Sequence, residues 1–213
     1  WLAERVGLPF WYVTLAASDS NRMAINLARS VTGRSKLLMF NTGYHGTVEP
    51  EKILGLSKAR AIIRGAPENT VLEICQGRNL FDIKGLTFEH EGKIFSTPER
   101  EPLDLGRLPV PAFHALNFQK YFYEILGNNF ALFEISRGCR FKCTFCNKVM
   151  YGEKVRSKSK EQIIEEVVLA IEKYGVKSGY FIDLDFLTDK YIIEGLCNFL
   201  IKKQYKFQWT CQT

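Results

Sequence analysis

Three cysteines stand close together in the middle of the chain and have the spacing of metal ligands. They are Cys139, Cys143 and Cys146, in the run Ser-Arg-Gly-Cys-Arg-Phe-Lys-Cys-Thr-Phe-Cys. The spacing CxxxCxxC on one short loop brings three thiolates within reach of one metal centre, and it supplies only three. Structural zinc sites normally take four protein ligands, and most iron–sulfur clusters are held by four cysteines. Three cysteines on a cubane cluster therefore leave one iron free to bind a substrate or a cofactor.

This run resembles the cluster loop of the radical S-adenosylmethionine (radical SAM) enzymes, which reads CxxxCx-aromatic-C, with Phe145 at the aromatic position. The resemblance implies a 4Fe–4S cluster whose free iron is chelated by S-adenosylmethionine. It also implies reductive cleavage of that cofactor to a 5′-deoxyadenosyl radical, which abstracts hydrogen from a small-molecule substrate. An external electron donor of the flavodoxin or ferredoxin type is implied as well. In such enzymes the cofactors supply the chemistry and the protein positions them.

Simpler interpretations of the cysteines stay open. The three could be buried core cysteines, or a zinc knuckle completed by His114, Cys197 or Cys211. Cys197 falls on an apolar helical face and Cys211 in a strand-like run, where cysteines are usually inert. A non-catalytic zinc-binding module is therefore the alternative function.

Two aspartates follow a second predicted strand, at Asp183 and Asp185. Because side chains alternate along extended chain, both should lie on one side, facing the interior of a barrel. The resemblance implies that they orient S-adenosylmethionine and that Phe145 packs near its adenine. The alternatives are a surface acid at Asp183, a helix N-terminal acid at Asp185 and simple core packing of Phe145.

The elements that must position these residues are predicted over residues 128–213. Strands are expected at 131–136, 177–182 and 206–211, with helices between them at 160–174 and 188–203. Ser159 and Gln162 form a capping box for the first helix, and Gly175 sits at its C-terminal end. Strands and helices in this order predict parallel pairing through right-handed crossovers, as in a complete or partial βα barrel. The cysteine loop follows the first strand, at the reactive end of such a barrel.

Residues 51–127 predict a strand at 59–63, a helix at 67–75 and a β-hairpin formed by 83–88 and 93–96. A linker from 97 to 117 follows, with four of the chain's seven prolines. The run Leu108-Pro109-Val110-Pro111-Ala112-Phe113 resembles the connector between the cobalamin-binding domain and the barrel of cobalamin-type radical SAM proteins. That resemblance implies cobalamin in the intact protein, although His45 does not match the cobalamin-ligating histidine.

Residues 1–50 carry a different resemblance, to class III pyridoxal-phosphate aminotransferases. It rests on the run from Leu27 to Arg34, on Lys36 to Phe40, and on Gly43-Tyr44-His45-Gly46. A loop before the helix would hold the cofactor phosphate, but here it reads Ala-Ala-Ser-Asp-Ser-Asn. The Schiff-base lysine of that family lies beyond the resemblance, so pyridoxal phosphate is not expected. A remnant of an aminotransferase is a further alternative.

The sequence thus predicts an α/β protein in three parts. These are an aminotransferase-like fragment (1–50), the tail of a cobalamin-binding-like domain with hairpin and Pro-rich linker (51–127), and the first part of a radical SAM partial barrel (128–213). Because the chain starts at Trp1 and stops after a strand-like run, we expect a fragment that is inactive alone. The junction near Pro50 would be a fusion or a sequence-assembly artefact.

Composition narrows the class of protein. The 213 residues are 46% apolar and 24% charged, as in ordinary globular proteins. No apolar stretch approaches the ~18 residues of a membrane span, so no membrane association is expected. Six cysteines, three of them clustered, suit metal binding in a reducing cytoplasm. The net charge of +6 gathers partly after the cysteines, as in a solvated loop, and nucleic-acid binding is unsupported.

Overall fold

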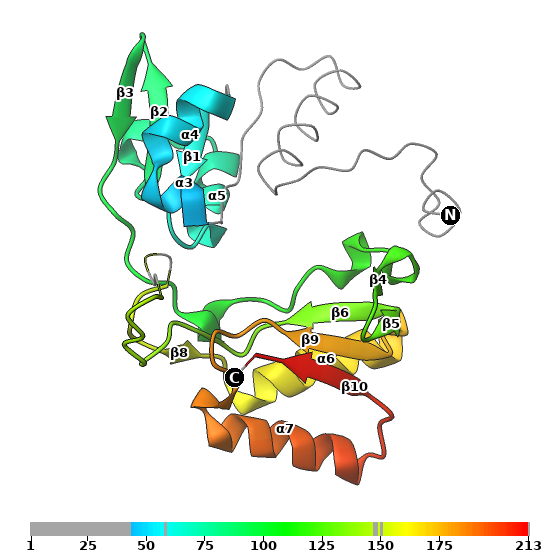
Figure 1. The fold of residues 1–213 in the computed structure, drawn as a ribbon. Coiled ribbons are helices and arrows are strands. Elements are labelled where there is room, and N and C mark those ends of the chain that lie inside the picture. Colours follow the sequence, from blue (N-terminus) through cyan, green and yellow to red (C-terminus); the bar gives the residue numbers. More distant parts are fainter. Residues whose placement is uncertain (1–43, 58, 147–148, 150, 213) are drawn as a thin grey trace. The chain divides into compact units, whose positions relative to one another are not determined.

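The computed structural model describes residues 44–57, 59–146, 149 and 151–212. Contacts divide these residues into two units, one comprising 44–103 with 149 and 151, and the other comprising 104–146 and 152–212. The predictions for residues 1–43 lie outside the described residues. Each unit is described by itself (Figure 1).

The first unit is a small antiparallel sheet with helices. Its helices are α3 (Tyr44–Val48), α4 (Pro50–Ser57) and α5 (Glu68–Cys75), and its strands are β1 (Ala61–Ile63), β2 (Leu86–His90) and β3 (Lys93–Ser96), in the order β1-β2-β3. The predicted hairpin is confirmed as β2 and β3, joined by Glu91 and Gly92, both with positive φ. Sequence patterns missed α4. The core gathers Ala61, Ile63, Ile83, Leu86 and Phe88.

The second unit contains a parallel sheet of three strands. They are β6 (Phe130–Phe133), β9 (Ser178–Phe181) and β10 (Gln208–Cys211), in the order β10-β9-β6. Helix α6 (Lys160–Tyr174) connects β6 to β9, and α7 (Lys190–Lys202) connects β9 to β10. The predicted parallel pairing is confirmed, with Phe133 and Cys211 each opposite Phe181.

Several short elements complete this unit. Two-residue ladders are formed by β4 (Phe122–Tyr123) with β5 (Gly127–Asn128), and by β7 (Ser136–Arg137) with β8 (Arg156–Ser157). Single 3-10 turns lie at Leu105–Arg107, Phe113–Ala115, Phe118–Lys120 and Phe186–Thr188. Three of these turns fall in or just after the Pro-rich linker, where prolines prevent longer helices.

Helix α6 begins and ends as its sequence predicts. The Ser159 hydroxyl accepts the backbone N–H of Gln162 at 3.1 Å, and Gly175 ends the helix with φ of 65°. The second half of the predicted capping box is wrong, however. The Gln162 side chain does not turn back to Ser159, but donates to the carbonyls of Leu105 and Leu108 at 3.1 and 2.9 Å. The helix is thereby fastened to the Pro-rich linker.

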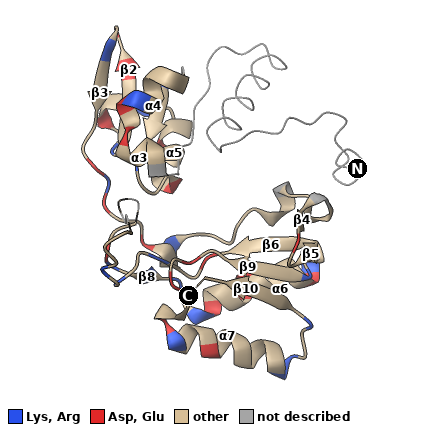
Figure 2. Cartoon of the chain, viewed as in Figure 1, with Lys and Arg blue, Asp and Glu red and all other residues tan. Residues whose placement is uncertain are grey.

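Helix α7 begins at Lys190, two residues later than predicted, because Thr188 belongs to the preceding 3-10 turn. Asp189 caps the helix by accepting the N–H of Ile192 at 3.3 Å. Figure 2 shows basic and acidic residues interspersed along α7. Such mixed charge is typical of a helix that turns one face to solvent.

The two helices cover one face of the parallel sheet (Figure 1). Under them lies the core, where the rings of Phe133 and Phe181 are 5.5 Å apart and α6 and α7 contribute buried aliphatic side chains. The opposite, open face exposes Leu132, Ile182 and Leu184, at 54%, 44% and 43%. In the described part of the chain, no helix has the length and apolar character needed to cross a lipid bilayer.

Candidate functional site

The cysteine loop leaves the sheet at the carboxyl end of β6, as predicted. The chain passes from Phe133 through the β7–β8 ladder, in which Ser136 pairs with Ser157 and Arg137 with Arg156. Residues 138–146, which hold the three cysteines, leave this ladder after Arg137, and residues 152–155 lead back to it before Arg156. In α/β proteins, ligands bind at the carboxyl edge of parallel strands. The loop is therefore at the edge of the sheet where chemistry is expected.

None of the six cysteines, all of which lie in the described part of the chain, forms a disulfide. Cys139 is half-buried, while Cys143 and Cys146 are exposed. The Cys139 N–H donates to the Gly152 carbonyl at 3.3 Å, and the Cys146 N–H to the Cys143 carbonyl at 3.1 Å. Within the described residues, no three His, Cys, Asp or Glu side chains lie close enough together to hold a metal ion. The backbone of the loop is thus positioned, and convergence of the three sulfurs stays a prediction.

The donor set nevertheless fits an iron–sulfur cluster. Thiolates are the ligands that hold such clusters, and three cysteines lie close together in the chain with no disulfide competing for them. Exposure at Cys143 and Cys146 leaves both sulfurs accessible to iron. Arg140, Lys142 and Lys154 are also exposed beside these cysteines.

The backbone conformation just before the first cysteine requires a glycine at position 138. Its φ is +96°, and a Cβ built there would lie 2.4 Å from the Lys154 carbonyl oxygen. Only glycine allows the two arms of the loop to approach this closely. The first arm therefore packs directly against the backbone of the returning arm.

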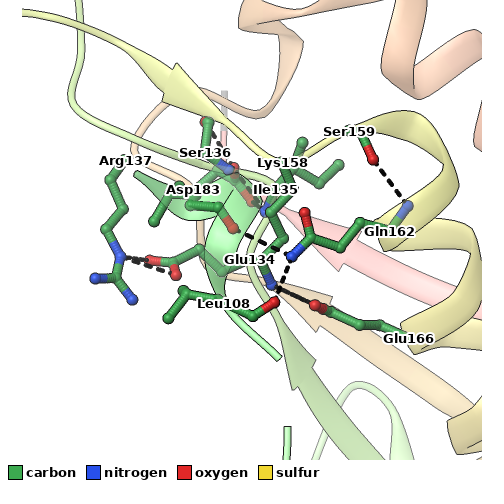
Figure 3. A network of polar contacts seen from close by, with 11 residues as sticks. Leu108, Glu134, Ile135, Ser136, Arg137, Lys158, Ser159, Gln162, Glu166 and Asp183 are labelled. Atoms are coloured by element: carbon green, nitrogen blue, oxygen red, sulfur yellow. Dashed lines mark hydrogen bonds and ion pairs between the residues drawn. The ribbon is translucent and has the colours of Figure 1, made fainter. Parts of the chain in front are cut away.

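Asp183 lies two residues beyond β9 and is 1% exposed (Figure 3). Its Oδ1 accepts the Ser136 N–H at 2.5 Å, the Ser136 hydroxyl at 2.7 Å and the Ile135 N–H at 3.2 Å. Its Oδ2 accepts the same Ile135 N–H at 3.2 Å. The predicted alternation holds, but it turns Asp183 to the buried side, since the exposed positions are Ile182 and Leu184. Asp183 is therefore no surface acid.

Burial raises the pKa of the Asp183 carboxyl above its ordinary value, although the hydrogen bonds from Ser136 and Ile135 oppose that shift. The negative charge of Glu134 raises the pKa further. Glu134 is in turn held by Arg137, whose Nε lies 2.8 and 2.9 Å from its two carboxylate oxygens. The start of the cysteine loop is thus surrounded by carboxylates and a guanidinium.

A buried ion pair lies beside this cluster of carboxylates. The Lys158 ammonium donates to both carboxylate oxygens of Glu166 at 2.9 and 2.7 Å, and the two side chains are 5% and 1% exposed. The backbone N–H of Lys158 donates to the Ile135 carbonyl at 2.8 Å. Burial raises the pKa of Glu166, while the charge of Lys158 lowers it. Figure 3 shows the pair next to Asp183 and Ser136.

The other predicted cofactor contacts lie apart from this network. Asp185 is buried, precedes the 3-10 turn at 186–188, and accepts the Thr188 hydroxyl at 2.8 Å. Phe145 is 92% exposed, so the alternative of core packing is wrong for it. No described contact joins Phe145 or Asp185 to the cysteines. Their roles toward S-adenosylmethionine stay predictions.

Cys197 and Cys211, offered as zinc ligands, are half-buried, and burial raises the pKa of both thiols. His114 is exposed on the 3-10 turn at 113–115. Sequence reasoning missed Ser136, Lys158 and Glu166. The only local signal for the ion pair is an acid on the otherwise apolar stripe of α6, since the pairing itself depends on tertiary packing.

Comparison with known proteins gives sequence relatives, whereas no family model matches. An uncharacterized methyltransferase of Pyrococcus horikoshii is 32% identical over 155 residues, which are 70% of this chain and 33% of the relative. The anaerobic magnesium-protoporphyrin IX monomethyl ester cyclase of Rubrivivax gelatinosus is 29% identical over 184 residues, covering 80% of this chain and 32% of the cyclase. The chain spans about a third of the length of these relatives. Neither is an aminotransferase, and that resemblance of residues 1–50 is unsupported.

Solved structures show the same fold. The cobalamin-dependent S-adenosylmethionine radical enzyme OxsB, with aqua-cobalamin and S-adenosylmethionine bound, matches with a TM-score of 0.70 and 20% identity, over 92% of this chain and 29% of OxsB. The radical S-adenosylmethionine methyltransferase TsrM from Kitasatospora setae, with cobalamin and a [4Fe-4S] cluster bound, matches with a TM-score of 0.60 and 14% identity, over 87% of this chain and 37% of TsrM. The sequence relatives are named as a methyltransferase and a cyclase, so the likeness of this chain is to enzymes. The sequence relatives and the solved structures together point to the cobalamin-dependent radical SAM methyltransferases as the family that this chain resembles.

Proposed function

We propose that this chain carries the cluster-binding part of a cobalamin-dependent radical SAM enzyme that acts on a small molecule. The observation that carries the proposal is the placement of Cys139, Cys143 and Cys146 on one loop at the carboxyl edge of a parallel sheet. Supporting it are the shared fold with OxsB and TsrM and the methyltransferases and cyclases among the sequence relatives. Residues from about 128 onward would then belong to a partial βα barrel.

In this proposal the three cysteines hold a 4Fe–4S cluster that leaves one iron for S-adenosylmethionine. When bound, the cluster supplies the electron that cleaves the sulfonium, and cobalamin in the intact protein supplies a carrier for a methyl group. The chain's own residues hold and orient these groups. Phe145, exposed between two of the cysteines, offers a ring to the adenine. Asp185 offers a carboxylate to the ammonium or ribose hydroxyls.

The basic residues around the cysteines give the proposed electron donor a surface to approach. Figure 2 shows basic segments on the loop beside β8, and Arg140, Lys142 and Lys154 are exposed there. Small electron carriers of the flavodoxin or ferredoxin type are acidic, so positive charge would steer their approach. Electron transfer to the protein should therefore slow as the salt concentration rises.

The direct test is anaerobic reconstitution of the full protein with iron and sulfide. We expect about four irons and four sulfides per chain, a broad visible absorption band and an electron paramagnetic resonance signal after reduction. Cys143→Ala should abolish the signal or reduce the iron content severely, because the remaining two thiolates cannot hold the cluster.

Cys75→Ala is the matched control, since Cys75 is equally a free, exposed cysteine but lies on α5 in the other unit. It should leave iron and sulfide unchanged. A finding of one zinc per chain with no inorganic sulfide would overturn the proposal in favour of a zinc-binding module. Equal iron content in the Cys143→Ala and wild-type proteins would also overturn it.

A further inference from the structure

We infer that Asp183 is a positioning residue that holds the base of the cysteine loop from the neighbouring strand, and that its carboxylate does not contact S-adenosylmethionine. The inference rests on the proposed function for the meaning of the loop, but the contacts themselves do not depend on it. It changes the role that the sequence alone predicts for this aspartate.

The carboxylate of Asp183 is fully engaged by the chain. It accepts the backbone N–H groups of Ile135 and Ser136 and the Ser136 hydroxyl, all from the segment that ends three residues before Cys139. At 1% exposure, no face of the carboxylate is left for a ligand. A buried carboxylate with these three donors organises backbone, because each N–H would otherwise lack a partner.

The orientation of the segment leads to the same conclusion. Ile182 and Leu184, on either side of Asp183, are exposed on the open face of the sheet. Phe181, two residues before Asp183, lies in the core beneath α6 and α7. The Asp183 side chain therefore lies on the buried side of the sheet. A cofactor bound on the open face would contact Ile182 and Leu184 instead.

The same base is held from a second side. The Lys158 N–H bonds the Ile135 carbonyl, and its ammonium is fixed by Glu166 on α6. The peptide groups around Ile135 are thus held through their N–H groups by Asp183 and through a carbonyl by Lys158. Both arms of the loop are fastened where they leave the sheet, so the cysteines start from a fixed frame (Figure 3).

Two substitutions at Asp183 distinguish the effect of its hydrogen-bond acceptors from the effect of its negative charge. In Asp183→Asn, an amide oxygen at the Oδ1 position keeps the bonds to Ser136 and one to Ile135, while the amide NH₂ at the Oδ2 position cannot accept the Ile135 N–H. Asp183→Ala removes every bond. A positioning role predicts a mild effect for the amide and a severe one for the alanine. A charge-dependent cofactor contact predicts that both fail.

Hydrogen exchange of the protein without added iron provides a readout that needs no cofactor. In Asp183→Ala, amides in segment 133–139 should exchange about tenfold faster or more, while those of α7 keep their protection. In Asp183→Asn, exchange of the segment should stay within about threefold of wild type. Unchanged exchange in Asp183→Ala would overturn the inference. If Asp183→Ala does not fold, Ser136→Ala, which removes only the hydroxyl bond, should still increase the exchange rate of the segment. Unchanged exchange in Ser136→Ala would then contradict the inference.

The reconstituted protein provides the second readout. Asp183→Asn should keep its cluster content and bind S-adenosylmethionine within about threefold of wild type, while Asp183→Ala loses iron faster to a chelator. A tenfold loss of cofactor affinity in Asp183→Asn, with cluster and exchange intact, would assign the charge to the cofactor and overturn the inference. If wild-type protein takes up no cluster, the proposed function fails, and the exchange measurement still decides the role of Asp183.

Discussion

Burial of the Asp183 carboxylate is energetically unfavourable, but it allows this group to bind the backbone at the start of the cysteine loop. A carboxylate loses hydration on burial, and this loss raises its pKa even though three donors from Ile135 and Ser136 surround it. Two further groups face it, Glu134 at the end of β6 and Cys211 on β10. The ionised form thus accepts the hydrogen bonds, while burial and Glu134 favour the protonated form.

A pH dependence follows from the raised pKa of Asp183. Because the folded value lies above the ordinary 3.8, the folded chain binds the proton more tightly than the unfolded chain does. The stabilisation is fully present below the unfolded pKa and is lost as pH rises through the folded pKa. Wild type should therefore gain stability over Asp183→Asn as the pH falls from 7 toward 4, measured by denaturant unfolding of both proteins. A difference that stays constant or shrinks on acidification would contradict this.

Gly138 provides a second prediction at the scale of a single residue. Gly138→Ala combines a positive φ with a Cβ placed 2.4 Å from the Lys154 carbonyl oxygen, so backbone must move. We expect a loss above the roughly 1–2 kcal/mol of left-handed strain alone, with faster tryptic cleavage in the loop. Gly152→Ala is the control, since Gly152 also has positive φ but nothing within 4 Å of the added Cβ. Equal losses for the two variants would show that the close approach is unimportant.

Helix α6 is the element that links the other parts of the second unit. Its buried stripe of Ile163, Val167 and Ala170 packs on the sheet, as apolar positions at helical spacing predict. Glu166 breaks this stripe with a charge that, among the described residues, pairs with the Lys158 ammonium. Buried ion pairs contribute little net stability over apolar packing, but breaking one leaves an uncompensated charge.

Glu166→Gln should therefore cost about 3–5 kcal/mol of unfolding free energy, because the Lys158 ammonium stays buried without its counter-ion. The neighbouring exposed residue supplies the control, and Glu165→Gln should change stability by less than about 0.5 kcal/mol. Denaturant unfolding measures both. Replacing both partners, Lys158→Met with Glu166→Leu, should recover much of the loss. Similar values for the two single variants would refute the role of the pair.

The sequence predicts those features of these elements that depend on near neighbours. Ser159 is three residues from the N–H it caps, and Gly175 ends its helix by its own conformational freedom. Asp183, in contrast, bonds Ser136 across 47 residues, and the alternation rule gives its side of the strand but not which side the core covers. As candidate ligands, the cysteines could be named from their spacing alone. Their fixed base could not, because it depends on which strand lies beside which.

At the scale of the molecule, β9 is the central strand, parallel to β6 and β10 on either side. The carboxyl ends of all three strands therefore meet at one edge, with the cysteine loop after β6 and the aspartates after β9. The alternation of strands and helices in the sequence predicted this arrangement.

The side chains of Gln162 and Glu166 are one turn apart on α6. Gln162 binds backbone carbonyl groups, whereas Glu166 binds a lysine side chain. Gln162 holds the carbonyls of Leu105 and Leu108 in the Pro-rich linker, and Glu166 holds Lys158 at the foot of the cysteine loop. Residues four apart share a helix face, about 6 Å from one to the other. A displacement of the linker at Leu105 and Leu108 would therefore be transmitted through the rigid helix α6 to the backbone that supports the cysteines.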